Sequence, residues 1–291
     1  MLDLDSPITS DLAAQSTALR RIARDAALKV APALLAAFRS RMAIDYKVDL
    51  HDPVTAFDRQ SEATIREHIM AAAPNSVIIG EEGGRAGSGN IEWYVDPIDG
   101  TSNFACGLAF WCVSIGAVID DEIVAGVVYD PVADDMFSAD LTGAWLGDEP
   151  LRSVGQPDEA RATLITGYPV MRDFRLDGRD VVLADLGELI EAFSTLRRPG
   201  SGALSLCHVA AGWVDAAAGF GANPWDVTAG ALIVRQAGGE YRPLTLGRVA
   251  PGTAAHLCPG YVAVAGGGNY PTLDRVTAGI SARRHNRPAG H

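Results

Sequence analysis

The chain of 291 residues has few cysteines, no long apolar run and fewer basic than acidic side chains. Its four cysteines form no Cys-x-x-Cys pair and have no histidine at zinc-finger spacing, which argues against a disulfide framework or a structural zinc site. No stretch approaches the roughly eighteen consecutive apolar residues of a membrane-spanning helix. The N-terminus also lacks the basic and then apolar order of a signal peptide. We therefore expect a cytoplasmic protein without a membrane partner.

The charge balance excludes a second group of functions. A formal net charge of -12 argues against a broad surface for nucleic acid or for anionic lipid. Any phosphate site would therefore depend on metal ions rather than on a basic patch. Hydrophobic residues make up 48% of the chain, which is ample for a sizeable core.

Helical and strand-like patterns alternate along the chain and predict an α/β fold. The expected helices are 13–41, 58–73, 181–193, 203–212, 270–282 and one that begins at Asp226. The expected strands are 77–80, 91–95, 112–119, 123–129, 144–146, 163–167, 215–218 and 261–265. The glycine-rich segment 83–90 is typical of a mobile flap, and the basic segment 283–288 of a frayed terminus. A polar run near residue 155 predicts an N-terminal metal-binding half, 1–155, and a C-terminal half, 156–291, that closes the active site.

The segment Asp96-Pro97-Ile98-Asp99-Gly100-Thr101 combines two carboxylates, a proline, a glycine and a hydroxyl directly after the strand-like run 91–95. Asp96 therefore lies at a strand's C-terminal end, where open α/β sheets bind ligands. Gly100 permits a backbone conformation that a Cβ atom would disfavour, so peptide N–H groups can face an anion while Asp96 and Asp99 face a hard cation. The same residue types build ordinary turns, so the segment alone leaves that interpretation open.

Further carboxylates also lie at the end of a strand or at the start of a helix. Glu81 comes directly after the strand 77–80, and Asp226 opens a late helix. Together with Asp96 and Asp99 they can surround Mg²⁺, which prefers oxygen ligands in octahedral geometry. Each acid alone is equally consistent with a turn or a helix cap, so the hypothesis of a metal site depends on their combination.

Four motifs in a fixed order carry a family resemblance. They are Val54-Thr55-Ala56-Phe57-Asp58, Gly80-Glu81-Glu82, the run from Asp96 to Phe104, and Trp225-Asp226-Val227-Thr228-Ala229-Gly230 continuing to Gly239. With these motifs the chain resembles the inositol monophosphatase family of magnesium-dependent, lithium-sensitive phosphatases over most of its length. Such a combination is far more specific than a lone glycine pattern. The resemblance implies the layered αβαβα sandwich of the inositol monophosphatase and fructose-1,6-bisphosphatase type, and a homodimer.

The resemblance also implies roles for individual residues. Two or three Mg²⁺ ions per site would be held by Glu81, Asp96, the carbonyl of Ile98, Asp99 and Asp226. The catalytic groups would be Glu81, Thr101 paired with Asp58 to orient the attacking water, Glu82 close enough to assist, and the matching lysine Lys47. Phosphate and substrate would contact Asp99, Gly100, Thr101, Ser102, Arg198 and Asp226. Water would then attack phosphorus in line, with no phosphoenzyme.

Two alternatives belong to other classes. Haloacid-dehalogenase-like phosphatases use Asp-x-Asp-x-Thr with a nucleophilic first aspartate, whereas the spacing here is Asp-x-x-Asp. One added residue would redirect the second carboxylate away from the acid role that this chemistry requires. The other alternative is a non-catalytic protein that only binds a metabolite.

The substrate is the least defined part of the prediction. The family resemblance implies a small phosphorylated metabolite similar to inositol-1-phosphate, with histidinol phosphate, fructose-1,6-bisphosphate and 3′-phosphoadenosine compounds as alternatives. In animal members a glutamate seven residues before the Trp-Asp acid contacts inositol hydroxyls, whereas this chain has Gly219 there. Because a missing hydrogen-bond partner can change discrimination by orders of magnitude, strict inositol specificity is not expected.

Overall fold

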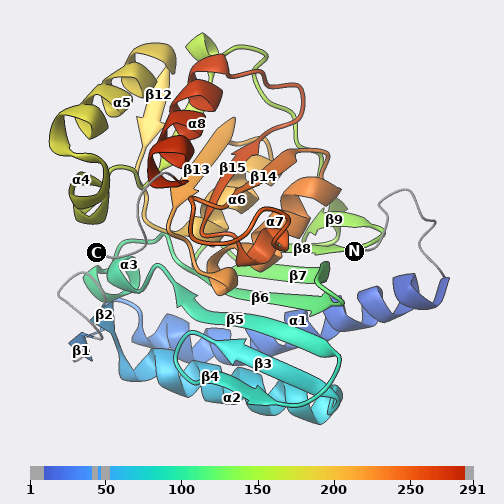
Figure 1. Ribbon diagram of the computed structural model, residues 1–291. Coiled ribbons are helices and arrows are strands. Elements are labelled where there is room, and N and C mark those ends of the chain that lie inside the picture. The colour runs from blue at the N-terminus through green and yellow to red at the C-terminus, as the bar shows by residue number, and fades with distance from the viewer. Residues whose placement is uncertain (1–9, 41–44, 47–52, 286–291) are drawn as a thin grey trace.

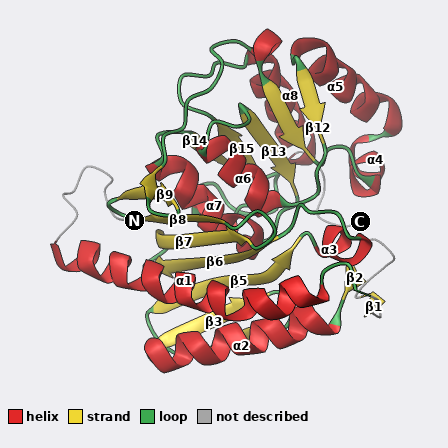
Figure 2. Cartoon of the chain, turned by 180° about the vertical axis from the view of Figure 1, so that it is seen from behind, coloured by secondary structure: helices red, strands yellow, loops and turns green. Residues whose placement is uncertain are grey.

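Helices and sheets alternate in five layers in the computed structural model, which describes residues 10–40, 45–46 and 53–285 (Figures 1 and 2). Helices α1 and α2 cover one face of a large sheet, α6 and α7 lie between this sheet and a smaller one, and α5 and α8 cover the far face of the smaller sheet. The predicted αβαβα sandwich is thereby confirmed. The α-helices are α1 (Ser10–Ala37), α2 (Ala56–Ala72), α3 (Thr101–Cys106), α4 (Met171–Asp177), α5 (Arg179–Ala192), α6 (Gly202–Ala210), α7 (Pro224–Gln236) and α8 (Pro271–His285).

The large sheet has eight strands in the order β10-β9-β8-β7-β6-β5-β3-β4. They are β3 (Ser76–Gly80), β4 (Gly84–Gly87), β5 (Ile91–Asp99), β6 (Cys112–Ile119), β7 (Glu122–Asp130), β8 (Asp135–Asp140), β9 (Gly143–Leu146) and β10 (Glu149–Pro150). Only the β3–β5 pairing within this sheet is parallel. Side chains alternate between the faces, so Trp93 and Val95 pack toward α1 and α2 while Tyr94 packs in the central layer.

The smaller sheet has five strands in the order β12-β11-β13-β15-β14. They are β11 (Thr163–Thr166), β12 (Thr195–Arg197), β13 (Ala216–Phe220), β14 (Glu240–Leu244) and β15 (Gly260–Val264). Ala217 and Ala263 face the central layer, whereas their neighbours Ala216 and Val262 belong to the outer core beneath α5 and α8. Two short strands, β1 (Asp45–Tyr46) and β2 (Pro53–Val54), form a separate pair.

Two glycines on the large sheet let α7 approach it closely. Gly116 on β6 and Gly126 on β7 are register partners, and a Cβ atom at either would overlap Thr228 or Ala229 of α7. The Ser114 hydroxyl adds a hydrogen bond of 3.0 Å to the Trp225 carbonyl. The start of α7, with its acid, is therefore held against the large sheet near the end of β5.

The structure corrects two local expectations. The glycine-rich flap is instead an edge strand, β4, which pairs antiparallel with β3. The basic segment at the C-terminus is not frayed where it is described, because Arg283 and Arg284 belong to α8. Arg284 is buried and forms ion pairs of 2.7 Å with both Asp173 and Asp177. These partners lie more than a hundred positions away in the chain, so no local pattern could indicate them. None of the described helices is both long enough and apolar enough to cross a membrane.

Candidate active site

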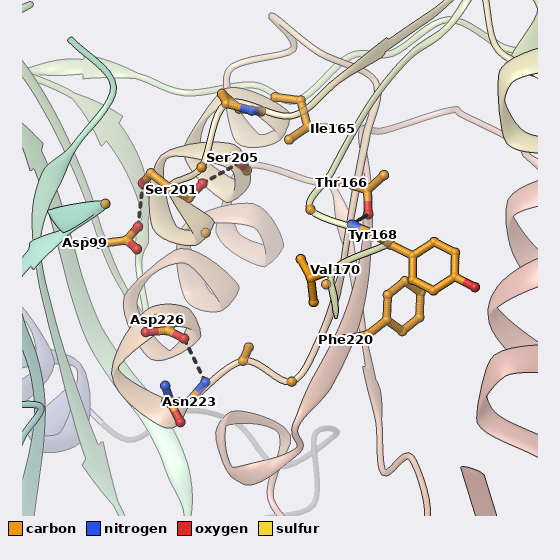
Figure 3. A pocket seen from close by; sticks show the side chains of 18 of the residues that line it. Asp99, Ile165, Thr166, Tyr168, Val170, Ser201, Ser205, Phe220, Asn223 and Asp226 are labelled. Carbon is orange, nitrogen blue, oxygen red and sulfur yellow. Dashed lines mark hydrogen bonds between the residues drawn. The ribbon is translucent and has the colours of Figure 1, made fainter. Parts of the chain in front are cut away.

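A cavity of about 400 Å³ opens between the end of β5, the starts of α6 and α7, and the ends of β11 and β13. Its size suits a small metabolite. Asp99 and Asp226 lie on one side of it, and Tyr168, Val170 and Phe220 lie on the other (Figure 3). The cavity therefore has an acidic side and a largely apolar side.

Three carboxylates converge on the acidic side. Asp96, Asp99 and Asp226 each offer an oxygen, and these oxygens lie within 4.8 Å of one another. On a regular strand, residues three apart would face opposite sides of the sheet. The register of β5 against β6 shifts between Asp96 and Asp99, and Pro97 lies within that shift, so both acids reach one cluster.

Burial and like charge would favour a cation at this cluster. Desolvation raises the pKa of Asp96, and the charges of Glu81, Asp99 and Asp226 raise it further. Burial also raises the pKa of Asp99. Glu81 lines the same cavity and makes a side-chain hydrogen bond with Asp96. The donors are all oxygens, which are the ligands that hard divalent cations prefer.

Asp99 belongs to the acidic cluster and also links the large sheet to α6, which lies between the two sheets. Its Oδ2 accepts hydrogen bonds from the Ser201 hydroxyl, at 2.5 Å, and from the Ala203 N–H, at 2.7 Å. Both donors belong to the start of α6, where exposed N–H groups favour a negative charge. The Asn103 amide makes a parallel link by donating to the Pro199 carbonyl at 2.7 Å.

Asp226 is fixed by the turn before its helix. Its Oδ2 accepts the Asn223 N–H at 2.7 Å, and this arrangement is the second half of a capping box. Asn223 is thus the N-cap residue, and Asp226 lies three positions inside α7 rather than opening it.

A hydroxyl and a second carboxylate lie beside the acidic cluster. Gly100 adopts a left-handed conformation with φ of 95° and places Thr101 at the start of α3. The Thr101 Oγ1 atom lies 3.1 Å from Asp58 Oδ1 and 3.0 Å from the Ile98 carbonyl oxygen. The other oxygen of Asp58 accepts the N–H of Thr55 at 2.8 Å and its hydroxyl at 2.6 Å. Burial raises the pKa of Asp58, which favours its action as a proton acceptor.

The turn that carries Glu81 depends on a residue that sequence reasoning missed. Glu62 of α2 is buried, and its carboxylate accepts the N–H groups of Glu82, at 2.6 Å, and Gly83, at 2.8 Å. The available signal was a glutamate three positions before Ile65 and seven before Ile69, on the inward face of a predicted helix.

The structure brings most of the predicted residues together but not all of them. Gly100, Thr101 and Ser102 line the cavity. Arg198 does not, because it is exposed and donates to the Pro169 carbonyl at 2.8 Å. Glu82 is held in the turn after β3 and is also outside the cavity lining. Lys47 falls outside the described residues.

Comparison with known proteins agrees with this geometry. The model of the inositol monophosphatase family matches residues 15–273. The chain belongs to this family. Inositol monophosphatase 2 of Solanum lycopersicum is 38% identical over 258 residues, which cover 83% of this chain and 95% of that protein. The Nus factor SuhB of Pasteurella multocida is 41% identical over 192 residues, or 65% of this chain and 71% of its own.

The fold of the inositol monophosphatase family is also matched among solved structures. The inositol monophosphatase from Anabaena has a TM-score of 0.72 and 29% identity, and the match covers 93% of this chain and 96% of that one. The chain is thus a phosphoric monoester hydrolase of a metal-dependent family, and its substrate is a small phosphate ester.

Proposed function

We propose that the protein is a Mg²⁺-dependent phosphomonoesterase that transfers the phosphoryl group of a small metabolite directly to water. The observation that carries this proposal is the cluster of Asp96, Asp99 and Asp226 beside the Thr101–Asp58 pair. One half of such a site can hold cations and phosphate, and the other can accept a proton.

The donor set fits Mg²⁺. The ligands would be Glu81, Asp96, the Ile98 carbonyl, Asp99 and Asp226, shared among two or three ions. When bound, Mg²⁺ stabilises charge on the phosphoryl oxygens and makes bound water more acidic. Without a cation these buried carboxylates repel one another, as the raised pKa of Asp96 indicates.

The phosphate would lie at the start of α3. Gly100, Thr101 and Ser102 line the cavity there, and the first N–H groups of a helix have no partner within the helix. The scissile ester would then point toward the wall formed by Tyr168, Val170 and Phe220 (Figure 3).

The proton of the attacking water would leave through Thr101. As the water oxygen bonds to phosphorus, its proton passes to Thr101 Oγ1, and the hydroxyl proton of Thr101 passes to Asp58 Oδ1 across 3.1 Å. The bond from phosphorus to the alcohol oxygen breaks, and the alkoxide takes a proton from solvent. The Thr55 N–H and hydroxyl hold Asp58 in position for this step.

The two alternative classes are disfavoured by the same geometry. Asp96 and Asp99 have the Asp-x-x-Asp spacing and are grouped with a third acid, Asp226, whereas dehalogenase-like chemistry uses Asp-x-Asp with a nucleophilic first aspartate. A mere binding protein would not require the Thr101–Asp58 pair next to the acids.

A first test combines turnover with metal binding. We expect Mg²⁺-dependent phosphate release from at least one of inositol-1-phosphate, histidinol phosphate, fructose-1,6-bisphosphate and adenosine-3′,5′-bisphosphate. Asp99→Asn keeps the side-chain volume but removes a ligand charge, so turnover should fall by more than about a hundredfold. The rise in melting temperature on adding Mg²⁺ should shrink in parallel.

The matched control is Asp148→Asn, because the Asp148 side chain is 94% exposed in the turn before β10. It should retain wild-type turnover. Near-normal Mg²⁺-dependent activity of Asp99→Asn would refute the proposed site.

We also propose that the protein is a cytoplasmic homodimer inhibited by lithium. Family membership supports the dimer and the inhibition, and four free cysteines, three of them buried, are consistent with a reducing compartment. We further propose that 1–155 and 156–291 are its two halves, since the strands of the large sheet precede residue 155 and those of the smaller sheet follow it.

A further inference from the structure

One positive charge lies at the apolar side of the cavity. Among the described residues that line the cavity, Arg172 is the only lysine, arginine or histidine. It belongs to α4, the short helix whose N-cap is Val170. Val170 lies on the side of the cavity opposite Asp99 and Asp226 (Figure 3). The mechanism proposed above does not use it.

The guanidinium of Arg172 is held in place rather than free to swing into solvent. It donates a hydrogen bond to the Phe220 carbonyl, and 39% of its side chain is exposed. A Cβ atom at Gly221 would overlap the guanidinium, and Gly221 has a φ of 109° that other residues rarely adopt. The chain thus provides space for this side chain at the cavity wall.

Within the described part of the chain, Arg172 has no carboxylate to itself. The ion pair it forms there is with Asp173, whose Oδ1 lies 4.0 Å from Nε. One oxygen of Asp173 accepts the Val170 N–H and the other accepts Arg284, each at 2.7 Å. Burial lowers the pKa of Arg172. The charge of Asp173 raises this pKa, and the charges of Arg248 and Arg284 lower it. A guanidinium has five N–H donors, and one carbonyl does not satisfy them.

A second position in the cavity wall, Gly219 on β13, also differs from the animal relatives. A Cβ atom at Gly219 would lie 2.5 Å from the Tyr261 ring, so a carboxylate side chain cannot occupy the position that contacts inositol hydroxyls in animal relatives. The cavity therefore offers the cation of Arg172, and at Gly219 an aromatic ring takes the space where animal relatives have a carboxylate.

We infer that Arg172 binds a second anionic group, a carboxylate or a phosphate, on the alcohol portion of the substrate. The enzyme then prefers phosphate esters that carry two anionic groups over monophosphates of neutral polyols. This inference rests on the proposed phosphatase reaction.

Two matched pairs of esters test it with the full-length enzyme and Mg²⁺. Glycerol-3-phosphate and 3-phosphoglycerate differ by a hydroxymethyl group against a carboxylate. Fructose-1-phosphate and fructose-1,6-bisphosphate differ by a second phosphate. We expect kcat/KM to favour the ester with two anionic groups by about tenfold to a hundredfold in at least one pair, as a hydrogen bond to a charged group implies. The pair that responds identifies the kind of anion.

Three variants assign the preference to the side chain. Arg172→Gln should lose the preference for the ester with two anionic groups, mainly because KM for that ester rises. The kinetics of the other ester of the pair should change little. Arg172→Lys keeps the charge and should keep part of the preference. Arg161→Gln removes the same charge from an exposed site paired with Asp158 at 2.6 Å, and should behave as wild type.

Because each preference is a ratio measured on one protein sample, partial misfolding of a variant cancels. Release from all four esters without preference, or a preference that survives Arg172→Gln, would overturn the inference alone. Equal losses on both members of each pair would place Arg172 on the reacting phosphate and would also overturn it. No release from any of the four esters, nor from the wider set named above, would overturn the phosphatase proposal and this inference with it.

Discussion

Gly219 and Tyr261 are register partners on the neighbouring strands β13 and β15. The Tyr261 ring stacks on Tyr241 with ring centroids 5.7 Å apart and occupies the space beside Gly219. A single position in the sequence suggested only that a carboxylate was missing. The structure shows that the Tyr261 ring occupies the space that such a carboxylate would need. One substitution at Gly219 therefore cannot restore the carboxylate of the animal relatives.

Gly219→Glu should therefore cost stability without conferring inositol specificity. Forcing side-chain atoms into space that the Tyr261 ring already occupies typically destabilises a protein by about 1–3 kcal/mol. We expect a lower midpoint in urea unfolding and no rise in kcat/KM for inositol-1-phosphate. The double variant Gly219→Glu/Tyr261→Ala should lose less stability than the sum of the losses of the two single variants, because the ring that the new glutamate would clash with is then absent. A stable single variant with improved turnover of inositol-1-phosphate would contradict this explanation.

The predicted site residues that come together in the structure lie in compact motifs. Asp96 and Asp99 are close in the chain, and their strand and its following turn could be inferred from local pattern. Arg172, which also lines the cavity, belongs to a seven-residue helix without a recognisable motif, so the sequence did not indicate its position there. Arg198 was expected at the substrate because of the resemblance, whereas its carbonyl partner at Pro169 holds it outside the cavity.

At the scale of secondary-structure elements, the turn between β3 and β4 connects a helix to the proposed metal site. Glu62 of α2 holds this turn through two backbone N–H groups, and a Cβ atom at Gly80 would overlap its carboxylate. Arg66, one helical turn later, pairs with Glu62 at 2.7 Å. The position of Glu81 is thus set by α2.

Glu62→Gln should weaken the site without touching substrate. An amide can accept through one oxygen only, so one backbone N–H would face a donor instead of an acceptor. Turnover should fall by about tenfold to a hundredfold, and the Mg²⁺ concentration for half-maximal activity should rise. Glu67→Gln, on the exposed side of the same helix, is the control and should match wild type. An unchanged Mg²⁺ requirement would show that Glu62 has only a structural role.

Elements with clear apolar patterns were predicted, and those without were not. The hairpin of β6 and β7 agrees with its predicted range to within one residue at each end. Strands β8 and β14 carry charged or proline residues within short runs, which do not match an alternating pattern. Strand β4 is rich in glycine and exposed, so only its pairing with β3 defines it as a strand.

At the scale of the whole molecule, a buried histidine makes stability depend on pH. His256 is 1% exposed, and neither ring nitrogen has a hydrogen-bond partner among the described residues. Burial lowers its pKa from 6.5 to about 4, against the opposing charges of Asp121 and Glu92. The unfolded chain therefore binds a proton that the folded chain excludes, so this contribution to stability is lost as pH falls from about 6.5 to about 4.

His256→Phe should remove this pH dependence while keeping a ring against Tyr94, which packs edge-on at 4.9 Å. Between pH 7 and pH 4.5 the wild type should lose up to about 3 kcal/mol more unfolding free energy than the variant. The difference in unfolding free energy between the two proteins, measured in urea at each pH, isolates the contribution of His256. The buried aspartates raise stability as pH falls, but they do so in both proteins and cancel in the difference. Equal losses in wild type and variant would show that His256 does not titrate as proposed. His285→Phe, at an exposed site at the end of α8, is the control.

The hydrogen bonds from Ser201 and Ala203 to Asp99 have a consequence for the life of the polypeptide. A chain still emerging from the ribosome holds Glu81, Asp96 and Asp99 long before α6 and Asp226 exist, so it carries most of the acids but no assembled site. Hydrolysis can begin only after the two sheets have come together around α6 and α7. On the proposed mechanism, turnover itself would report that folding is complete.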